Sequence, residues 1–134
     1  IDHVAVAVAD IDEALSKYKD VLGLASTSRE VVESQKTEAV LLPIGDSNIE
    51  HISPKGNEGL LKFLEKSGGK GGLHHVAVEV EGIEDALKFL DGLGVPLLDK
   101  TPRKGARGHK VAFVHPKATG GLLVELGEAD ASHH

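Results

Sequence analysis

The chain has 134 residues, 40% of them hydrophobic and 27% charged, and these values predict a folded globular domain rather than a disordered segment. It contains no cysteine, which excludes disulfide frameworks and thiolate metal sites. Its formal net charge of −6 argues against nonspecific binding to nucleic acid. Because the sequence has neither an apolar run as long as a membrane span nor a signal peptide, we expect a cytoplasmic protein that does not bind membranes.

The beginning of the sequence occurs a second time further along the chain. Residues 3–15 and 75–87 share eight identities in thirteen positions, with His3 aligned on His75. A repeat with an offset of 72 residues in a chain of this length predicts two copies of one structural module.

The first copy begins with a short apolar strand over residues 3–9, which is followed by a helix. Asp10 and Glu13 form a potential capping box at the start of this helix, and Gly23 is a potential C-cap. The expected apolar face of the helix consists of Ala14, Leu15, Tyr18, Val21 and Leu22. Three strands are predicted next, over residues 26–33, 37–42 and 48–53. A short helix over residues 60–66 should bury Leu60, Leu61, Phe63 and Leu64.

The second copy follows a glycine-rich hinge at residues 67–72. It repeats the strand at 76–80 and the helix at 83–93, and strands are predicted at 96–100, 110–114 and 121–126. Because one helix covers only one face of four strands, the two copies should pair. The prediction is one α+β domain in which tandem βαβββ modules, at about 1–66 and 73–128, form a curved, barrel-like mixed sheet around a cleft. Residues 129–134 form a tail, and its Ser132, His133 and His134 are expected to be remnants of a tag.

Both modules carry one histidine and one glutamate within apolar strands. His3 precedes Glu50 by 47 residues, and His75 precedes Glu125 by 50. A buried carboxylate is costly unless it is paired or coordinated, and two imidazoles with two carboxylates suit a divalent metal ion. The predicted cleft would then bind a metal. The alternatives are that these side chains point outward or that each His pairs with its Glu, since a one-residue slip reverses the face of a strand residue.

Glu38 is a further acidic residue in a predicted strand. If Val40 and Leu42 face inward, Glu38 does so too. The corresponding stretch of the second module, residues 110–114, has no acidic residue. An unpaired carboxylate present in one module only has the character of a specific general base, and an exposed strand end is the competing interpretation.

A basic segment interrupts the otherwise acidic sequence. No acidic residue occurs between Lys100 and Lys117, and the segment contains Lys100, Arg103, Lys104, Arg107, Lys110 and Lys117. Such a segment in an acidic protein indicates an anionic ligand, and a solvated loop explains it equally well.

Four segments occur in an order and at spacings that point to a known family: DHVAVA at 2–7, AVLLPIG at 39–45, KFLEK at 62–66 leading to GLHH at 72–75, and HPKATGGLLVEL at 115–126. Through them the chain resembles the vicinal oxygen chelate superfamily and, within it, the methylmalonyl-CoA epimerases. The resemblance extends from residue 1 to residue 128. Ala118 stands where a serine is usual in that family, and His51 where leucine is common.

The resemblance implies a metal-dependent isomerase that interconverts (2R)- and (2S)-methylmalonyl-CoA by α-proton abstraction and reprotonation through a metal-stabilised enolate. It implies His3, Glu50, His75 and Glu125 as ligands of a divalent ion, Co in the first place, with Mn, Ni or Zn as alternatives. It further implies Glu38 and Glu125 as acid–base groups, an acyl-CoA substrate and a homodimer. From charge, Lys100, Arg103, Lys104, Arg107 and Lys117 are expected to receive the CoA phosphates. Glyoxalase I, extradiol dioxygenases and non-enzymatic drug-binding proteins of the same fold are the alternative functions.

Overall fold

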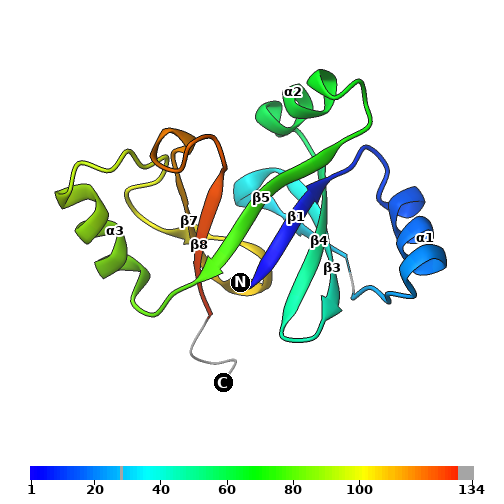
Figure 1. Cartoon of the computed structure of the whole chain (residues 1–134), viewed down its shortest axis with the longest axis horizontal. Helices are drawn as coiled ribbons and strands as arrows, with labels where there is room; N and C mark the ends of the chain where they lie inside the picture. The colour runs from blue at the N-terminus through cyan, green and yellow to red at the C-terminus, as the bar shows by residue number, and fades with distance from the viewer. Residues whose placement is uncertain (28, 130–134) are drawn as a thin grey trace. The chain divides into compact units, whose positions relative to one another are not determined.

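The computed structural model describes residues 1–27 and 29–129, so the expected tag residues 132–134 lie outside the described part. The backbone forms two compact units. The first unit comprises residues 3–74, and the second comprises Ile1–Asp2 together with the chain from His75 onward (Figure 1). Among the described residues no helix is long and apolar enough to cross a membrane.

The first unit is a four-stranded sheet with two helices. Its elements are β1 (His3–Ala7), α1 (Ile11–Leu22), β2 (Glu30–Val32), the 3₁₀ turn η1 (Glu33–Gln35), β3 (Thr37–Ile44), β4 (Ser47–Pro54) and α2 (Glu58–Lys66). The strand order is β2-β3-β4-β1. β1 runs parallel to β4, and the other neighbouring strands are antiparallel.

The second unit repeats this arrangement with one helix. Its elements are β5 (Gly72–Glu79, which starts in the first unit), α3 (Ile83–Gly92), β6 (Arg103–Lys104), η2 (Ala106–Gly108), β7 (Lys110–Val114), η3 (Pro116–Ala118) and β8 (Val124–Glu128). The strand order is β5-β8-β7-β6, with β5 parallel to β8. In both units the first strand of a βαβββ module therefore pairs in parallel with its last strand. The predicted α+β class with two such modules is confirmed.

One predicted strand of the second module is reduced to an isolated bridge. Residues 96–100 pair with β7 only through the isolated bridge between Leu97 and Val114. The backbone N–H groups of Leu98 and Asp99 both donate to the carbonyl oxygen of Phe113, at 3.0 and 3.2 Å. Two donors on one carbonyl interrupt the regular ladder, as in a β-bulge, and β6 takes the edge position instead.

The N-termini of α1 and α3 are capped in different ways. Asp10 accepts a hydrogen bond from the backbone N–H of Glu13 at 3.2 Å, and Gly23 ends α1 in a left-handed conformation with φ 68°, so Asp10 as N-cap and Gly23 as C-cap are confirmed. The Glu13 carboxylate of the predicted capping box instead lies 3.2 Å from Nζ of Lys17. α3 begins after Gly82, which has no capping side chain. Glu128 of β8 takes this role, because its carboxylate accepts hydrogen bonds from the N–H groups of Gly82 and Ile83.

The predicted apolar faces of α1 and α2 are too wide. Val21 and Leu22 are 79% and 58% exposed, so the last turn of α1 contributes no buried side chain. In α2 the buried pair is Leu60 and Leu64, while Leu61 is 45% exposed. Leu61 lies about 100° around the helix from Leu60, which turns its side chain away from the buried face.

His51 of β4 is fully buried against α1. Its ring lies edge-on to Tyr18, with 4.3 Å between the ring centroids. Neither ring nitrogen has a hydrogen-bond partner among the described residues. Desolvation by burial lowers the pKa of His51 below its ordinary value of 6.5. This position therefore carries two buried polar atoms that an apolar side chain would not have.

We expect His51→Leu to raise the free energy of unfolding by about 1–2 kcal/mol, since the cost of the unsatisfied nitrogens disappears. The gain should be larger at about pH 5.5 than at about pH 8, because a lowered pKa means that the unfolded chain binds more protons as the pH falls through about 6.5. Urea unfolding at the two pH values measures both effects. Equal or lower stability of the variant at both pH values would contradict the prediction.

Candidate metal centre

The first unit holds one buried histidine–glutamate pair. His3 lies at the start of β1 and Glu50 in the middle of β4, and both side chains are buried among apolar strand residues. The parallel register places Ala5 beside Glu50, so His3, two residues before Ala5, shares the face of the glutamate. The Nε2 atom of His3 is 3.5 Å from Oε1 of Glu50.

The second unit holds an equivalent pair in equivalent strands. His75 lies in β5 and Glu125 in β8, and each is at most 5% exposed. The Nε2 atom of His75 is 3.5 Å from Oε2 of Glu125. The structure therefore brings together the histidine and the glutamate that the sequence singled out in each module.

The donor atoms of these pairs fit a metal ion. His3, Glu50 and His75 are buried, and each offers a nitrogen or oxygen ligand atom of the type that holds metals in proteins. Imidazole nitrogen and carboxylate oxygen together suit Zn and the divalent ions of Mn, Co and Ni. A carboxylate buried next to imidazole also gains from coordination, because burial of its charge is otherwise costly. The chemistry of these residues indicates a metal site and leaves the identity of the metal open.

Glu38 lies on the opposite face of the sheet from Glu50. In the antiparallel register of β3 and β4, Glu50 stands opposite Leu41, and Glu38 stands opposite Ser53. Because Glu38 and Leu41 are three residues apart in a continuous strand, their side chains point to opposite faces. The expectation that Glu38 points toward the predicted metal ligands is therefore wrong.

The physical reason is that the buried face chosen from the sequence is the one covered by a helix. Glu38 does share a face with Val40, as predicted, and Val40 stands opposite His51. His51 contacts Tyr18 of α1, so this face packs under the helix. Strand periodicity gave the correct alternation of faces but could not tell which of two buried faces carries the metal ligands.

The contacts of Glu38 are ion pairs at the helix-covered face. Its carboxylate lies 3.5 Å from Nη1 of Arg29 and 3.5 Å from Nζ of Lys55. Lys110 occupies the corresponding position of the second module, and its Nζ lies 3.5 Å from Oε1 of Glu84 in α3. Both modules thus place a charged, ion-paired residue at this position, which favours a structural role for Glu38.

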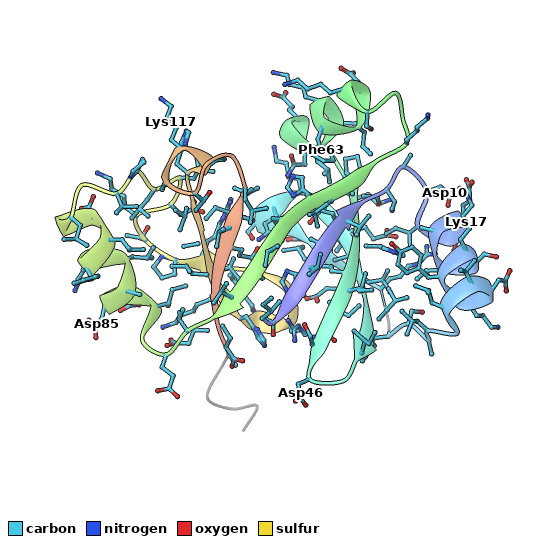
Figure 2. The ribbon with its side chains drawn as sticks, viewed as in Figure 1. Asp10, Lys17, Asp46, Phe63, Asp85 and Lys117 are labelled. Atoms are coloured by element: carbon cyan, nitrogen blue, oxygen red, sulfur yellow. The ribbon has the colours of Figure 1, made fainter. Side chains whose placement is uncertain are left out.

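The five cations expected to bind CoA phosphates do not share one face. Arg103 stands opposite Val111, and Lys104 stands opposite Lys110, which pairs with α3. Lys100 is paired with Asp91 at 3.6 Å, and Arg107 with Asp2 at 2.7 Å. Lys117 extends from η3 away from the strands of its unit (Figure 2). The segment is continuous in sequence, but successive residues of an extended chain point in opposite directions.

Phe113 is a neighbour of the second pair that the sequence did not single out. It stands opposite Glu125 in the register of β7 and β8, and its ring lies edge-on to His75 with 5.3 Å between ring centroids. Leu41 occupies the corresponding position opposite Glu50 in the first module. Extending the repeat alignment to the third and fourth strands of each module would have identified Phe113 as a residue of the Glu125 face.

Comparison with known proteins gives consistent results over nearly the whole chain. Residues 2–113 match the family model described as the glyoxalase/bleomycin resistance protein/dioxygenase superfamily. The chain is 40% identical to the uncharacterized protein YqjC of Bacillus subtilis, covering 100% of this chain and 95% of that protein. It is 37% identical to the mitochondrial methylmalonyl-CoA epimerase of Mus musculus, covering 96% of this chain and 72% of the relative.

A solved structure shows the same likeness. A variant of the methylmalonyl-CoA epimerase of Streptomyces coelicolor in complex with 2-nitronate-propionyl-CoA superposes with a TM-score of 0.91 at 30% identity. The match covers 98% of this chain and 94% of that chain. Relatives of this chain thus include proteins that bind acyl-CoA ligands.

Proposed function

Because the chain belongs to the glyoxalase/bleomycin resistance protein/dioxygenase superfamily, we propose that it is a metal-dependent epimerase that interconverts (2R)- and (2S)-methylmalonyl-CoA. The observation that carries this proposal is that one histidine and one glutamate are buried at the same strand positions of each unit, which supplies two imidazoles and two carboxylates. The similarity to methylmalonyl-CoA epimerases supports the choice of substrate.

In this proposal His3, Glu50, His75 and Glu125 hold one divalent ion, with Co as the first choice and Mn, Ni or Zn as alternatives. Two neutral imidazoles and two carboxylates balance the charge of the ion. A bound ion supplies Lewis acidity, which makes the α-proton of the thioester easier to remove.

The protein must remove the α-proton from one face of the substrate and return a proton to the other face. Glu125 is the acid–base group that the sequence named and that lies within the buried pairs. Glu38 does not fit the second role, since it faces α1. We assign that role to one of two glutamates, Glu30 at the start of β2 or Glu33 directly after it. Glu30 stands opposite Ala39 and so lies on the face of Leu41 and Glu50, and Glu33 follows at the first position of η1.

The direct test is the incorporation of deuterium at the α-carbon. Protein loaded with Co²⁺ is incubated with (2S)-methylmalonyl-CoA in D₂O, and the label is followed by mass spectrometry against a sample without protein. The proposal requires label in the α position together with formation of the (2R) form. Exchange no faster than in the sample without protein would contradict it.

We expect Glu38→Gln to keep the exchange rate within about threefold of the unsubstituted protein, because Glu38 is an ion-pair residue on the helix-covered face. Glu30→Gln or Glu33→Gln should instead lower the rate by at least about a hundredfold, the usual loss on removal of a general acid or base. The three variants remove the same charge from neighbouring positions and so control for one another. Loss of exchange in Glu38→Gln alone would restore the assignment made from the sequence.

A further inference from the structure

Arg103 is the basic residue of β6 whose side chain lies on the face of the second histidine–glutamate pair. It stands opposite Val111, and Val111 lies two residues before Phe113 in β7. Phe113 in turn stands opposite Glu125. Because residues two apart in a strand share a face, Arg103, Phe113 and Glu125 belong to one face of the sheet. Lys104, the next residue, points to the other face.

Two neighbouring groups hold the guanidinium in place. The carboxylate Oδ2 of Asp99 accepts a hydrogen bond from the backbone N–H of Phe113 at 2.9 Å and lies 3.5 Å from Nη2 of Arg103. The guanidinium carbon of Arg103 is 5.7 Å from the centroid of the Phe113 ring, within cation–π distance. The aromatic ring and the carboxylate together fix the position of a long side chain that would otherwise be free to move.

Most of the hydrogen-bonding capacity of this guanidinium is not used by Asp99. An arginine side chain has five N–H donors in a planar fork that matches the oxygens of a carboxylate or phosphate. Among the described residues Asp99 is its one ion-pair partner, and the Arg103 side chain is 41% exposed. The ring of Phe113 also contacts His75, so one aromatic ring separates the guanidinium from a candidate metal ligand.

We propose that Arg103 is the anion-binding residue of the acyl-CoA site and contacts an oxyanion of the bound substrate. This inference rests on the proposed function and deepens it, because it selects one cation from the five that charge alone suggested. Carboxylate and phosphate oxyanions present the same chemistry to a guanidinium. The substrate carries both, and the two sources are separated by choosing the probe.

The experiment compares Arg103→Gln with Lys104→Gln in the metal-loaded protein. The two variants remove one positive charge from adjacent residues of the same strand, but only the first removes it from the face of Glu125. Binding is measured by calorimetry with two probes: CoA, which has phosphates and no malonyl carboxylate, and the methylmalonyl thioester of N-acetylcysteamine, which has the carboxylate and no phosphate. Metal content and thermal unfolding are recorded for each protein.

Arg103→Gln should weaken the binding of one probe by about tenfold to a hundredfold, the usual effect of losing a charge-assisted hydrogen bond. Weaker binding of CoA identifies a phosphate as the partner, and weaker binding of the thioester identifies the carboxylate. Lys104→Gln should change neither affinity by more than about twofold. Arg103→Lys should restore part of the affinity, since it returns the charge without the planar fork.

The proposal is overturned if Arg103→Gln binds both probes as tightly as Lys104→Gln does. It is also overturned if Arg103→Gln loses metal along with probe affinity, because Arg103 would then act through Phe113 and His75 rather than by contact with the substrate. A protein that fails the deuterium test yet shows Arg103-dependent binding of CoA would contradict the epimerase assignment and leave the role of Arg103 intact.

Discussion

Replacing His75 with alanine is expected to lower the affinity for Co²⁺ by at least about a hundredfold, since even residues that only support a metal ligand cost tenfold to a hundredfold. His75 is 3% exposed and lies 3.5 Å from Glu125, so the substitution leaves a buried carboxylate without its imidazole neighbour. Calorimetric titration of metal-free protein measures the affinity directly. A second measure is the thermal stabilisation by Co²⁺, which amounts to about 2.7 kcal/mol when the free ion is at a hundred times its dissociation constant.

His74→Ala is the matched control for this substitution. His74 is the preceding residue of β5 and therefore points to the other face, where its ring lies edge-on to Phe63 with 5.1 Å between centroids. We expect this variant to lose packing against α2 but to bind Co²⁺ as the unsubstituted protein does. Equal losses of affinity in the two variants, or none in His75→Ala, would remove His75 from the metal site.

Gly71→Ala is expected to destabilise the first unit by more than about 3 kcal/mol, a loss that few single substitutions reach. A Cβ atom at this position would lie 2.0 Å from the carbonyl oxygen of Ala7, at the end of β1. That neighbour is backbone, so the clash cannot be relieved by a side-chain rotation. Gly71 also has a φ of +73°, which adds the strain of a left-handed conformation. Urea unfolding followed by circular dichroism measures the change.

Gly69→Ala separates the two causes. Gly69 lies in the same hinge and has a φ of +80°, but nothing lies within 4 Å of the Cβ that would be added there. This variant should lose only the conformational term of about 1–2 kcal/mol. If Gly71→Ala is no less stable than Gly69→Ala, the close approach of the hinge to β1 does not constrain the fold.

Local signals were sufficient to predict the architecture. The repeat that aligns His3 with His75 identified two modules, and the caps at Asp10 and Gly23 placed α1 to within a residue. These features depend on residues that are close to one another in the sequence and on the backbone hydrogen bonds that every helix end has to satisfy. The burial of each histidine with the glutamate of its module also agrees with the sequence, for which the pairing of the two is one of the alternatives to a metal site.

The predictions that are wrong concern which face of a strand packs against which other element of the fold. Strand alternation correctly predicts that Glu38 shares a face with Val40. Both faces of β3 are buried, however, and only the contact of His51 with Tyr18 shows that the face of Glu38 lies under α1. The charge pattern predicts one basic patch, yet Arg103 and Lys104 point to opposite faces of β6. Charge and hydrophobic pattern do not identify the tertiary neighbour that decides such cases.

The different caps of α1 and α3 have a consequence for the order in which the two units fold. Asp10 is adjacent to its helix, so the first turn of α1 is stabilised as soon as that short segment becomes helical. The cap of α3 comes from Glu128, 45 residues after Ile83, and is available only when β8 has closed a long loop. Helix formation in the second unit is therefore coupled to its last strand, whereas the N-terminal cap of α1 requires no distant strand.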